Sequence, residues 1–416
     1  MKIKVTDESF KQRTRRTALE GVLEGKRTIS SASRMMNLSE TQTRRLLKMA
    51  TEQGLDAALE DKRKGNNNRN RIPQVIRDKI ISLYEDKYSG FNFCHYTSML
   101  NDFEAIHVSL STVRRILEAK SIKVPHKVKK RSPHRRRPAR AHAGELCQMD
   151  ASKHDWFTES KDGTMAEVYH HLYGLIDDAT CIVPALWMEK EETTHGYFML
   201  MRQVNETTGF PLNLYVDYRG TFSVNLKKDA SQTPSTELAG TREQYTTQFT
   251  RAMNDLNVDI IFASSGPAKG RIERLWETLQ DRLVNEFRIN SIKTEEQANA
   301  YFPSFLKRFN KEFSVKPADN NTFWQRKKNP QMLDIEMCPH YKMQLNSDFS
   351  VPYKGRYYVL PSKDVNGKQP KDYITRYRRS DVELILPYEG TPLMRTFDGR
   401  LFIPRVINGR KGENKK

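Results

Sequence analysis

The spacing of hydrophobic and polar positions changes along the chain, and each change marks a different kind of predicted element. Up to residue 120, apolar residues recur every three or four positions, which is typical of short amphipathic helices. Between residues 145 and 290, short apolar runs alternate with longer helical segments. From residue 341 onward, short β-like runs are separated by turns. The pattern predicts a multidomain α+β chain with a helical first part, an α/β middle and a small β domain at the end.

The helical part contains one ten-residue pattern twice, seventy positions apart. Residues 38–47 and 108–117 share an apolar residue, a Ser cap, a hydroxyl residue two places on, an Arg pair and an apolar pair. Each capped helix follows two other predicted helices, which is the pattern of a helix-turn-helix whose last helix lies in the DNA major groove. A solvated helix face is the alternative for either copy taken alone. The predicted DNA contacts in the two copies are Thr41, Thr43, Arg44, Arg45, Ser111, Thr112, Arg114 and Arg115.

The boundaries of these helices follow from local signals. Ser39, with Gln42 three places on, predicts the start of the third helix, and Gly54 predicts its end. The supporting helices are expected over Ile29 to Met36 in the first copy, and over Pro73 to Tyr88 and Tyr96 to Phe103 in the second.

The net charge of +19 is distributed unevenly. Residues 1–140 carry 32 Lys and Arg against 15 Asp and Glu, and residues 301–416 carry 23 against 12. Residues 141–300 carry 15 against 24, so an acidic middle lies between two basic ends. Basic surfaces suit a polyanionic partner, because Lys and Arg release the counterions condensed on phosphates. The acidic residues either keep the middle soluble or bind metal ions.

Other compositional features exclude several classes of protein. The four cysteines are scattered and form no C-x-x-C pair, which argues against a disulfide framework or a Cys-rich zinc site. No apolar run approaches the ~20 residues of a membrane span, and the first residues lack a signal-peptide core. We therefore expect a cytoplasmic protein without a membrane partner.

The segment from Lys120 to Arg140 contains ten Lys or Arg, three prolines and no acid. This composition predicts an extended arm that follows a phosphate backbone or enters a minor groove, although a solvated linker is the alternative. The predicted DNA contacts in the arm are Lys129, Lys130, Arg131, Arg135, Arg136 and Arg137.

The middle of the chain predicts three sequential strands followed by helix, strand, helix, strand and helix. This is the order of an RNase H-like domain, a mixed sheet flanked by helices. Asp150 is expected at the end of the first strand, Asp217 at the end of the fourth, and Glu273 on the last helix. The predicted elements span residues 145–149, 168–176, 181–188, 193–207, 211–216, 244–256, 258–262 and 268–287.

Three stretches of this middle part, residues 148–152 (QMDAS), 215–222 (YVDYRGTF) and 264–274 (SSGPAKGRIER), resemble the signatures of the retroviral-integrase-type catalytic core. They are most similar to bacterial insertion-sequence transposases, particularly the not-classified-yet (ISNCY-like) group. The resemblance implies that Asp150, Asp217 and Glu273 form a catalytic DDE triad that also binds the metal.

The residue types suit that chemistry. Mg²⁺ prefers carboxylate and water ligands, and two such ions ~4 Å apart activate the attacking oxygen and stabilise the leaving oxygen of an in-line displacement. We expect two Mg²⁺ ions, with Mn²⁺ as a substitute. The apolar stripe of the last helix places Glu273 beside the sheet edge and leaves three basic residues for phosphates, namely Lys269, Arg271 and Arg274.

Three alternatives stay open in this region. Asp177 and Asp178 are interpreted as turn residues, but either could approach a metal. Glu277 lies one helical turn after Glu273 and could take its place. The polar segment Val224 to Gly240 lengthens the spacing between Asp217 and Glu273 and is interpreted as a surface insertion.

The last third predicts a helix over Thr294 to Phe313 and then a small β-barrel. Its strands are expected over residues 349–351, 356–360, 373–377, 382–386 and 401–403. Basic residues interleaved with tyrosines suit contact with a DNA backbone, although aromatic strands are also ordinary barrel core. These residues are Lys354, Arg356, Arg376, Arg378 and Arg379.

The predicted domains are two helix-turn-helix units (1–60 and 73–120), an RNase H-like core (141–315) and a β-barrel (341–407). They are joined by a basic linker (61–72), the basic arm (121–140) and a second linker (316–340), and are followed by a disordered basic tail (408–416).

The hypothesis is a DDE transposase that binds the terminal inverted repeats of an insertion sequence, cleaves DNA 3′ ends with Mg²⁺ and transfers the strand into target DNA. Two ends must be joined, so a homodimer or larger synaptic complex is expected. The alternatives are an RNase H-like nuclease without strand transfer and a non-catalytic helix-turn-helix regulator.

Overall fold

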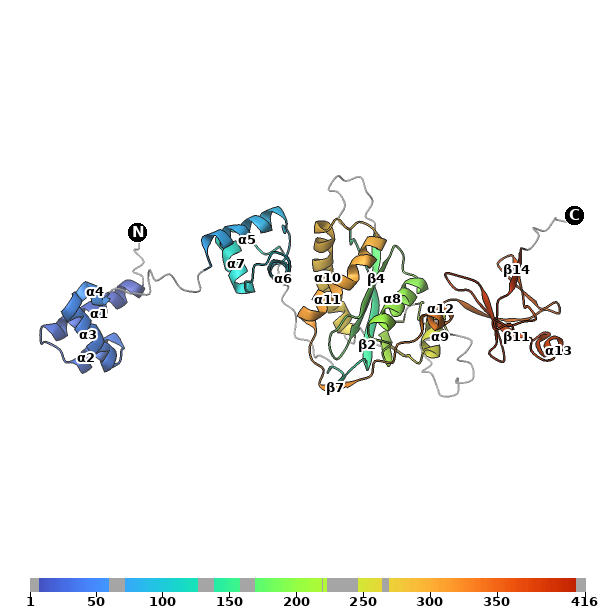
Figure 1. Cartoon of the computed structure of the whole chain (residues 1–416). Coiled ribbons are helices and arrows are strands. Elements are labelled where there is room, and N and C mark those ends of the chain that lie inside the picture. Colours follow the sequence, from blue (N-terminus) through green and yellow to red (C-terminus); the bar gives the residue numbers. More distant parts are fainter. Residues whose placement is uncertain are drawn as a thin grey trace, which may run out of the picture. The chain divides into compact units, whose positions relative to one another are not determined.

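The computed structural model describes residues 7–59, 72–125, 138–157, 169–218, 220–222, 246–263 and 269–408. The chain folds as two compact parts, residues 1–78 and 79–416, and the boundary lies within helix α5 (Gln74–Asp86). The elements are drawn in Figure 1. Most of the predicted basic linker, the six arm residues named above and the insertion between residues 224 and 240 lie outside the described residues.

The first helical unit is built from α1 (Asp7–Leu23), α2 (Ile29–Met36), α3 (Glu40–Gln53) and α4 (Leu55–Leu59). The predicted boundaries of α2 and α3 are confirmed, since the Ser39 side chain accepts a hydrogen bond from Gln42 N at 3.2 Å and α3 ends at Gly54 with φ 92°. The short α4 was not predicted. The core of the unit contains small and aliphatic side chains, namely Ala18, Leu19, Ala32 and Met36.

The second helical unit consists of α5, α6 (Phe93–Phe103) and α7 (Leu110–Ala119). Ser109 caps α7 as Ser39 caps α3, because its hydroxyl accepts a hydrogen bond from Thr112 N at 3.4 Å. The predicted repeat of a capped last helix is therefore confirmed. The interior of this unit is rich in aromatic rings, which are Tyr84, Tyr88, Phe91, Phe93 and Tyr96.

A five-stranded mixed sheet forms the centre of residues 141–315, with the strand order β4-β3-β2-β5-β6 among the described residues. Strands β2, β3 and β4 are antiparallel, whereas β2, β5 and β6 are parallel. The strands are β2 (Leu146–His154), β3 (His170–Asp177), β4 (Ala185–Glu189), β5 (Asn213–Val216) and β6 (Asp259–Phe262). The predicted order of helices and strands along the chain is confirmed, although β4 begins at Ala185 rather than at Cys181.

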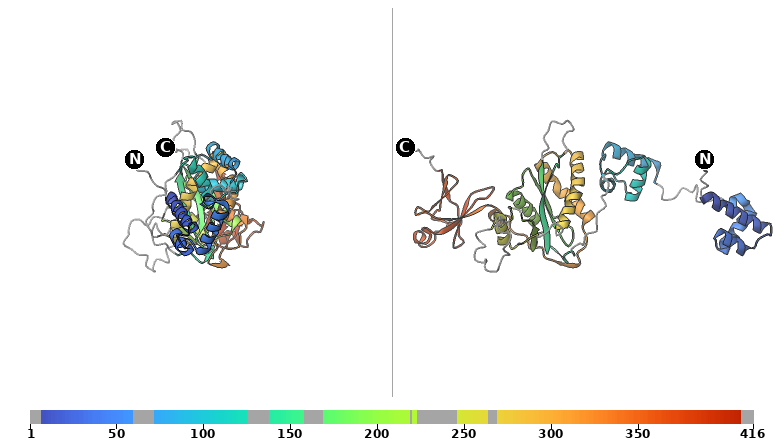
Figure 2. Two further views of the ribbon diagram at one scale, coloured as in Figure 1. Left: turned by 90° about the vertical axis from the view of Figure 1, so that its left-hand side faces the viewer. Right: turned by 180° about the vertical axis from the view of Figure 1, so that it is seen from behind.

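Helices cover both faces of this sheet, as Figure 1 shows, and the view from behind in Figure 2 shows the same layers. Helices α8 (Thr194–Thr207) and α9 (Gln248–Asp255) pack against one face, and α10 (Gly270–Ile289) and α11 (Glu295–Phe313) against the other. The predicted apolar stripe of α10 is buried at all four positions, which are Ile272, Trp276, Leu279 and Leu283.

One prediction about the sheet is wrong. Asp150 does not end its strand, because β2 continues to His154 and pairs with β3 from Cys147 to His154, with Asp150 opposite Gly174. On its other side, β2 pairs with the shorter β5 only from Leu146 to Gln148. Asp150 therefore lies inside a strand but beyond the point where β5 stops pairing with it.

The last part of the chain folds around a core shared by two small antiparallel sheets, ordered β13-β12-β11-β8 and β14-β10-β9 in the region that is described. The predicted single barrel is thus replaced by two sheets. The strands are β8 (His340–Gln344), β9 (Ser350–Tyr353), β10 (Arg356–Val359), β11 (Asp381–Ile385), β12 (Leu393–Thr396), β13 (Leu401–Phe402) and β14 (Arg405–Asn408). Before them come the pair β1 (His142–Ala143) and β7 (Asp319–Thr322), and the helix α12 (Pro330–Glu336).

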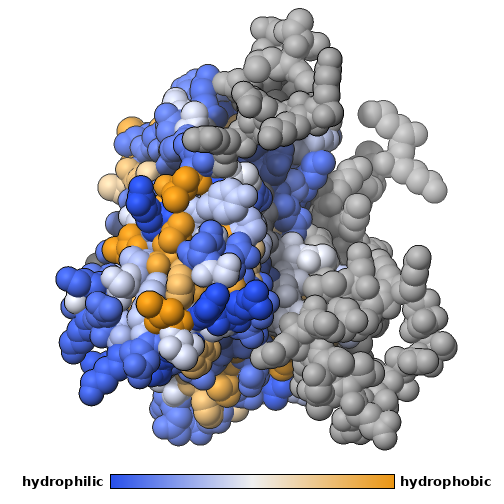
Figure 3. All heavy atoms as spheres, turned by 90° about the vertical axis from the view of Figure 1, so that its right-hand side faces the viewer, coloured by the Kyte–Doolittle hydropathy of each residue, from blue (hydrophilic) through white to orange (hydrophobic). Residues whose placement is uncertain are grey.

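The segment Tyr373–Tyr377, predicted as a strand, is the short helix α13. Tyr373 and Tyr377 are four residues apart, and this spacing puts two side chains on one face of either a helix or a strand. The surface of this domain carries exposed apolar residues among charged ones, including Ile374 and Phe397. Figure 3, which looks at the right-hand side of Figure 1, shows orange apolar residues set among blue hydrophilic ones.

Candidate active site

Two aspartates meet at one lysine ammonium. Lys269 Nζ lies 3.2 Å from Asp150 Oδ1 and 3.9 Å from Asp217 Oδ2. Asp217 directly follows β5, and continuing the β2–β5 register by two residues from Gln148 and Tyr215 places Asp217 beside Asp150. The exposed fractions of the three side chains are 14% for Asp150, 27% for Asp217 and 9% for Lys269, so the cluster is partly open to solvent.

The start of α10 is fixed to β2 by two further hydrogen bonds. Trp276 Nε1 donates to Asp150 Oδ2 at 3.3 Å, and Ile272 N donates to the Gln148 side-chain oxygen at 3.1 Å. Gly174, opposite Asp150 in β3, gives room to the indole, because a Cβ there would lie 2.7 Å from a ring carbon of Trp276. These roles were not predicted from the sequence, in which the available signal was a glycine inside an apolar strand.

Glu273 lies in the first turn of α10 and is exposed. Lys269, Glu273 and Trp276 follow one another at spacings of four and three, so they share one face at the start of the helix. Both of its neighbours on that face contact Asp150, so helical spacing puts Glu273 between two residues that touch this aspartate. Within the described ranges, no group of three His, Cys, Asp or Glu side chains is close enough to hold a metal ion.

Asp177 and Asp178 are structural. Both are buried, and Asp177 accepts hydrogen bonds from Gly144 N at 3.0 Å and from Thr180 N at 2.9 Å. Burial raises the pKa of the Asp177 carboxyl, and these hydrogen bonds oppose that rise. Asp178 accepts a hydrogen bond from Arg271 Nε at 2.9 Å. Their oxygens thus hold the neighbouring loops together, which does not favour the alternative that either approaches a metal.

Two of the three basic residues predicted to be available to phosphates are already paired. Lys269 is buried against the aspartates, and the guanidinium of Arg271 is bonded to the buried Asp178. Side chains from distant segments pair with both residues in this structure, and contact of either with a phosphate stays a prediction. Arg274 is exposed and stays a candidate for phosphate contact.

The capped helices present most of the predicted DNA-contacting side chains to solvent. Those that are exposed are Thr41, Arg44, Arg45, Ser111, Arg114 and Arg115, and Thr112 is half-buried. Thr43 is fully buried, and its hydroxyl donates to Ser39 O at 3.0 Å, so it cannot reach a base edge. The sequence repeat already pointed to a buried position here, since the residue that matches Thr43 in the second copy is the apolar Val113, which is buried.

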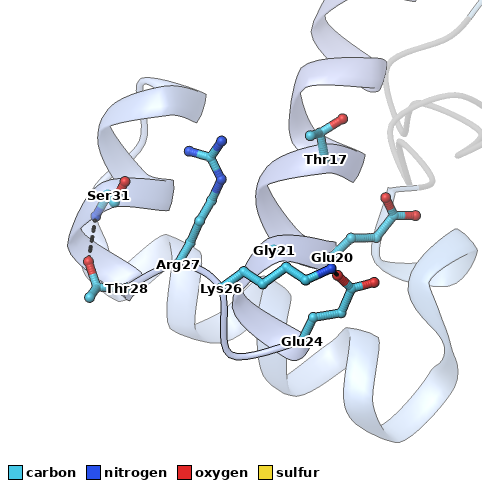
Figure 4. A pocket seen from close by; sticks show the side chains of 8 residues that line it. All are labelled: Thr17, Glu20, Gly21, Glu24, Lys26, Arg27, Thr28 and Ser31. Atoms are coloured by element: carbon cyan, nitrogen blue, oxygen red, sulfur yellow. Dashed lines mark hydrogen bonds and ion pairs between the residues drawn. The ribbon is translucent and has the colours of Figure 1, made fainter.

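A polar hollow of about 610 Å³ lies where α1, the following turn and α2 meet in the first helical unit. Figure 4 shows Lys26 reaching Glu24, to which it is paired at 2.7 Å, while Arg27 extends between the two helices. Gly21 leaves space for the Arg27 stem, because a Cβ there would lie 2.8 Å from Arg27 Cδ. The hollow is thus a packing feature of this unit.

Comparison with known proteins gives several findings. A family model described as winged helix-turn helix matches residues 15–78. The chain is 30% identical over 401 residues to y4bF of Sinorhizobium fredii, whose name describes it as a transposase, and the match covers 96% of this chain and 83% of that protein. It is 29% identical over 378 residues to the transposase for insertion sequence IS1202 of Streptococcus pneumoniae, covering 82% of this chain and 76% of that protein.

A solved structure of the simian T-cell lymphotropic virus intasome, in complex with PP2A regulatory subunit B56 gamma, is also similar. It matches 78% of this chain and 99% of that chain, with 13% sequence identity and a TM-score of 0.29. That score is too low to carry an argument about the fold. None of the helices that the structure describes is both long and apolar enough to span a membrane.

Proposed function

The chain belongs to the family of bacterial insertion-sequence transposases, and on this premise we propose that it is a DDE transposase with an RNase H-like catalytic core. One observation carries the proposal: Asp150 and Asp217 converge on a single cation where β5 ends, beside the helix face that holds Glu273. The strand order of the central sheet, with three antiparallel strands followed by two parallel ones, supports the RNase H-like assignment.

The donor set fits a hard divalent cation. The Lys269 ammonium, within 4.0 Å of both aspartates, supports the proposal that a positive centre is held beside them. Carboxylates are the ligands that Mg²⁺ prefers, and Mn²⁺ accepts the same donors. Asp150, Asp217 and Glu273 would hold the ions, which when bound supply activation of the attacking oxygen and stabilisation of the leaving oxygen.

The other residues of the site keep this donor set in place. Lys269 offsets the repulsion between two neighbouring carboxylates before a divalent ion binds. Trp276 and Gln148 fix the start of α10 against β2, so this helix keeps its position beside Asp150 while DNA enters. Arg274, exposed one position after Glu273, would contact a phosphate next to the one that is cut.

The two helical units would hold the DNA. Exposed Arg pairs on α3 and α7 are placed to bind the terminal inverted repeats, with the hydroxyl residues of the same helices beside them. Strand transfer joins two ends to one target, so the working form would be a homodimer or a larger assembly.

The test uses DNA from the flanks of the coding region, because the element ends lie there. Purified protein, an end-labelled duplex and Mg²⁺ should give a nick that exposes a 3′-OH at the element end. Asp150→Asn, Asp217→Asn and Glu273→Gln should each lower cleavage about a thousandfold while end binding stays unchanged.

Glu277→Gln is the matched control, since it changes the same residue type one helical turn further along α10. This variant should cleave like the wild type. The triad assignment fails if Glu273→Gln cleaves normally, or if Glu277→Gln abolishes cleavage in its place.

A further inference from the structure

The second helical unit is joined to the core by a buried polar contact that the proposed chemistry does not use. His95 on α6 lies 3.0 Å, through Nε2, from Glu286 Oε1 on α10. Each of the two side chains is 1% exposed. His95 also stacks on Phe91, with ring centroids 4.5 Å apart. A carboxylate and an imidazole are seldom removed so completely from water without a structural reason.

Glu286 is the centre of this contact. Its other oxygen accepts hydrogen bonds from Arg308, at 2.7 Å, and from the Tyr301 hydroxyl, both on α11. Burial alone would raise the pKa of Glu286, but the hydrogen bonds from His95 and Arg308 lower it to about 2. The carboxylate therefore stays charged while it connects α6, α10 and α11.

Further contacts extend the interface along α6. Asn92, His95 and Ser98, spaced three apart, each meet the core: Asn92 donates to Asp281, and Ser98 donates to Glu312 at 3.0 Å. Arg288 on α10 donates to the Ser89 carbonyl at 2.5 Å across the same interface, and Arg282 on α10 holds Glu312, the partner of Ser98, at 2.7 Å. One face of α6 is thus bonded to the second half of α10 and to α11.

The same helix, α10, therefore carries Glu273 in its first turn and holds the second helical unit on its last turns. Glu273 and Glu286 are thirteen residues apart, which corresponds to ~20 Å along a helix axis. That length equals roughly six base-pair steps at ~3.4 Å each. A DNA segment held by α7 would therefore be contacted several base pairs away from the phosphate at the carboxylates.

We propose that α10 acts as a ruler: the docked second helical unit fixes which phosphodiester of the bound end reaches Asp150, Asp217 and Glu273. His95 is a positioning residue in this device, because it acts through Glu286 and not on the DNA. The inference rests on the proposed function, since it concerns where that site cuts.

The test compares full-length variants on a labelled element end with Mg²⁺, and the 3′ termini are mapped to single-nucleotide resolution. His95→Ala should bind the end with unchanged affinity, lower the yield of the native cut about tenfold and spread the remaining cuts over neighbouring phosphodiesters. His95→Gln retains a donor for Glu286 and should restore a single cut. Ser98→Ala should cause a smaller spread.

Ser82→Ala is the matched control, because Ser82 is an exposed serine of the same unit whose hydroxyl bonds only to Asp86 in α5 among the described residues. It should cut like the wild type. The inference is overturned if His95→Ala cuts only the native phosphodiester at full yield, or if it loses end binding together with cleavage. A wild-type protein that cuts no end DNA would instead contradict the proposed function and the ruler with it.

Discussion

The two helical units share one sequence pattern, and each contains a helix capped by a serine. They differ in the side chains of their cores and in the burial of their ion pairs. The first unit has a core of small and aliphatic side chains, and its ion pairs lie on the surface, as between Arg44 and Glu40, whose side chains are 64% and 47% exposed. The second unit has an aromatic interior, and its pair of His95 with Glu286 is almost fully buried.

This difference indicates two uses of one motif. Exposed ion pairs contribute little to stability, whereas a buried charged network fixes one arrangement of its partners. The first unit is therefore interpreted as a module that adds affinity for DNA, and the second as a module that also sets where the DNA is cut.

Glu286→Gln should break the buried network and lower the free energy of opening of α6 and α10 by about 3 kcal/mol, because Arg308 loses its charged partner. Hydrogen exchange of peptides from these helices measures the change. The matched substitution in the first unit, Glu40→Gln, should change the opening of α3 by less than about 0.5 kcal/mol. Equal effects at the two sites would remove the contrast between the units.

The Arg pairs on the two capped helices should contribute similarly to affinity but differently to the cut. Replacing either Arg44 and Arg45 or Arg114 and Arg115 by Ala should weaken end binding about tenfold. The slope of log affinity against log salt concentration should fall by the amount expected for about two phosphate contacts. Only the second pair should also spread the cut positions. Fluorescence anisotropy at several salt concentrations, with mapping of 3′ termini, measures both effects, and a spread from the first pair would contradict the division.

The serine caps should contribute equally in both units. Ser39→Ala and Ser109→Ala should each lower the stability of the helix they cap by about 1 kcal/mol, whereas Gly at either position should change it by only a few tenths. Hydrogen exchange of α3 and α7 measures this. Unchanged exchange in both Ala variants would mean that the hydrogen bonds from Gln42 N and Thr112 N to the two serine hydroxyls do not stabilise these helices.

The smallest effect is one of pH. Burial lowers the pKa of His95, and Glu286, Arg282 and Asp281 on α10 are the charged groups that act on it. Because the folded state binds the proton less readily than the unfolded chain, stability is complete above the ordinary His pKa and falls as the pH drops below about 6.5. Hydrogen exchange of α6 should therefore accelerate modestly from pH 7.5 to 5.5.

The first unit is the internal control, because residues 1–78 contain no histidine. His95→Gln should remove most of the pH effect on α6. An effect of equal size in α3, or one that persists in His95→Gln, would assign the pH dependence to other groups.

Features with local causes were predictable from the sequence. Ser39 and Ser109 mark helix starts through bonds that span three residues, and the stripe of α10 follows from helical periodicity alone. Asp217 was expected after a strand, and the structure places it there. Such signals need no knowledge of which distant segments meet.

Features that depend on distant segments were not predictable. Asp150 looked like a strand end, but pairing with β3 extends its strand beyond it. Lys269 and Arg271 looked available for phosphates, but carboxylates from other elements neutralise them. The bond between His95 and Glu286 joins residues 191 positions apart, and no local pattern announces it.

One carboxylate site is proposed both to cut DNA and to join it. The most direct measurement supplies a pre-cut element end with a free 3′-OH, a supercoiled target plasmid and Mg²⁺, and detects covalently joined product. The account predicts joined product with the wild type, none with Asp150→Asn and none without a divalent ion. Joined product from Asp150→Asn, or a wild type that cuts ends but never joins them, would contradict it.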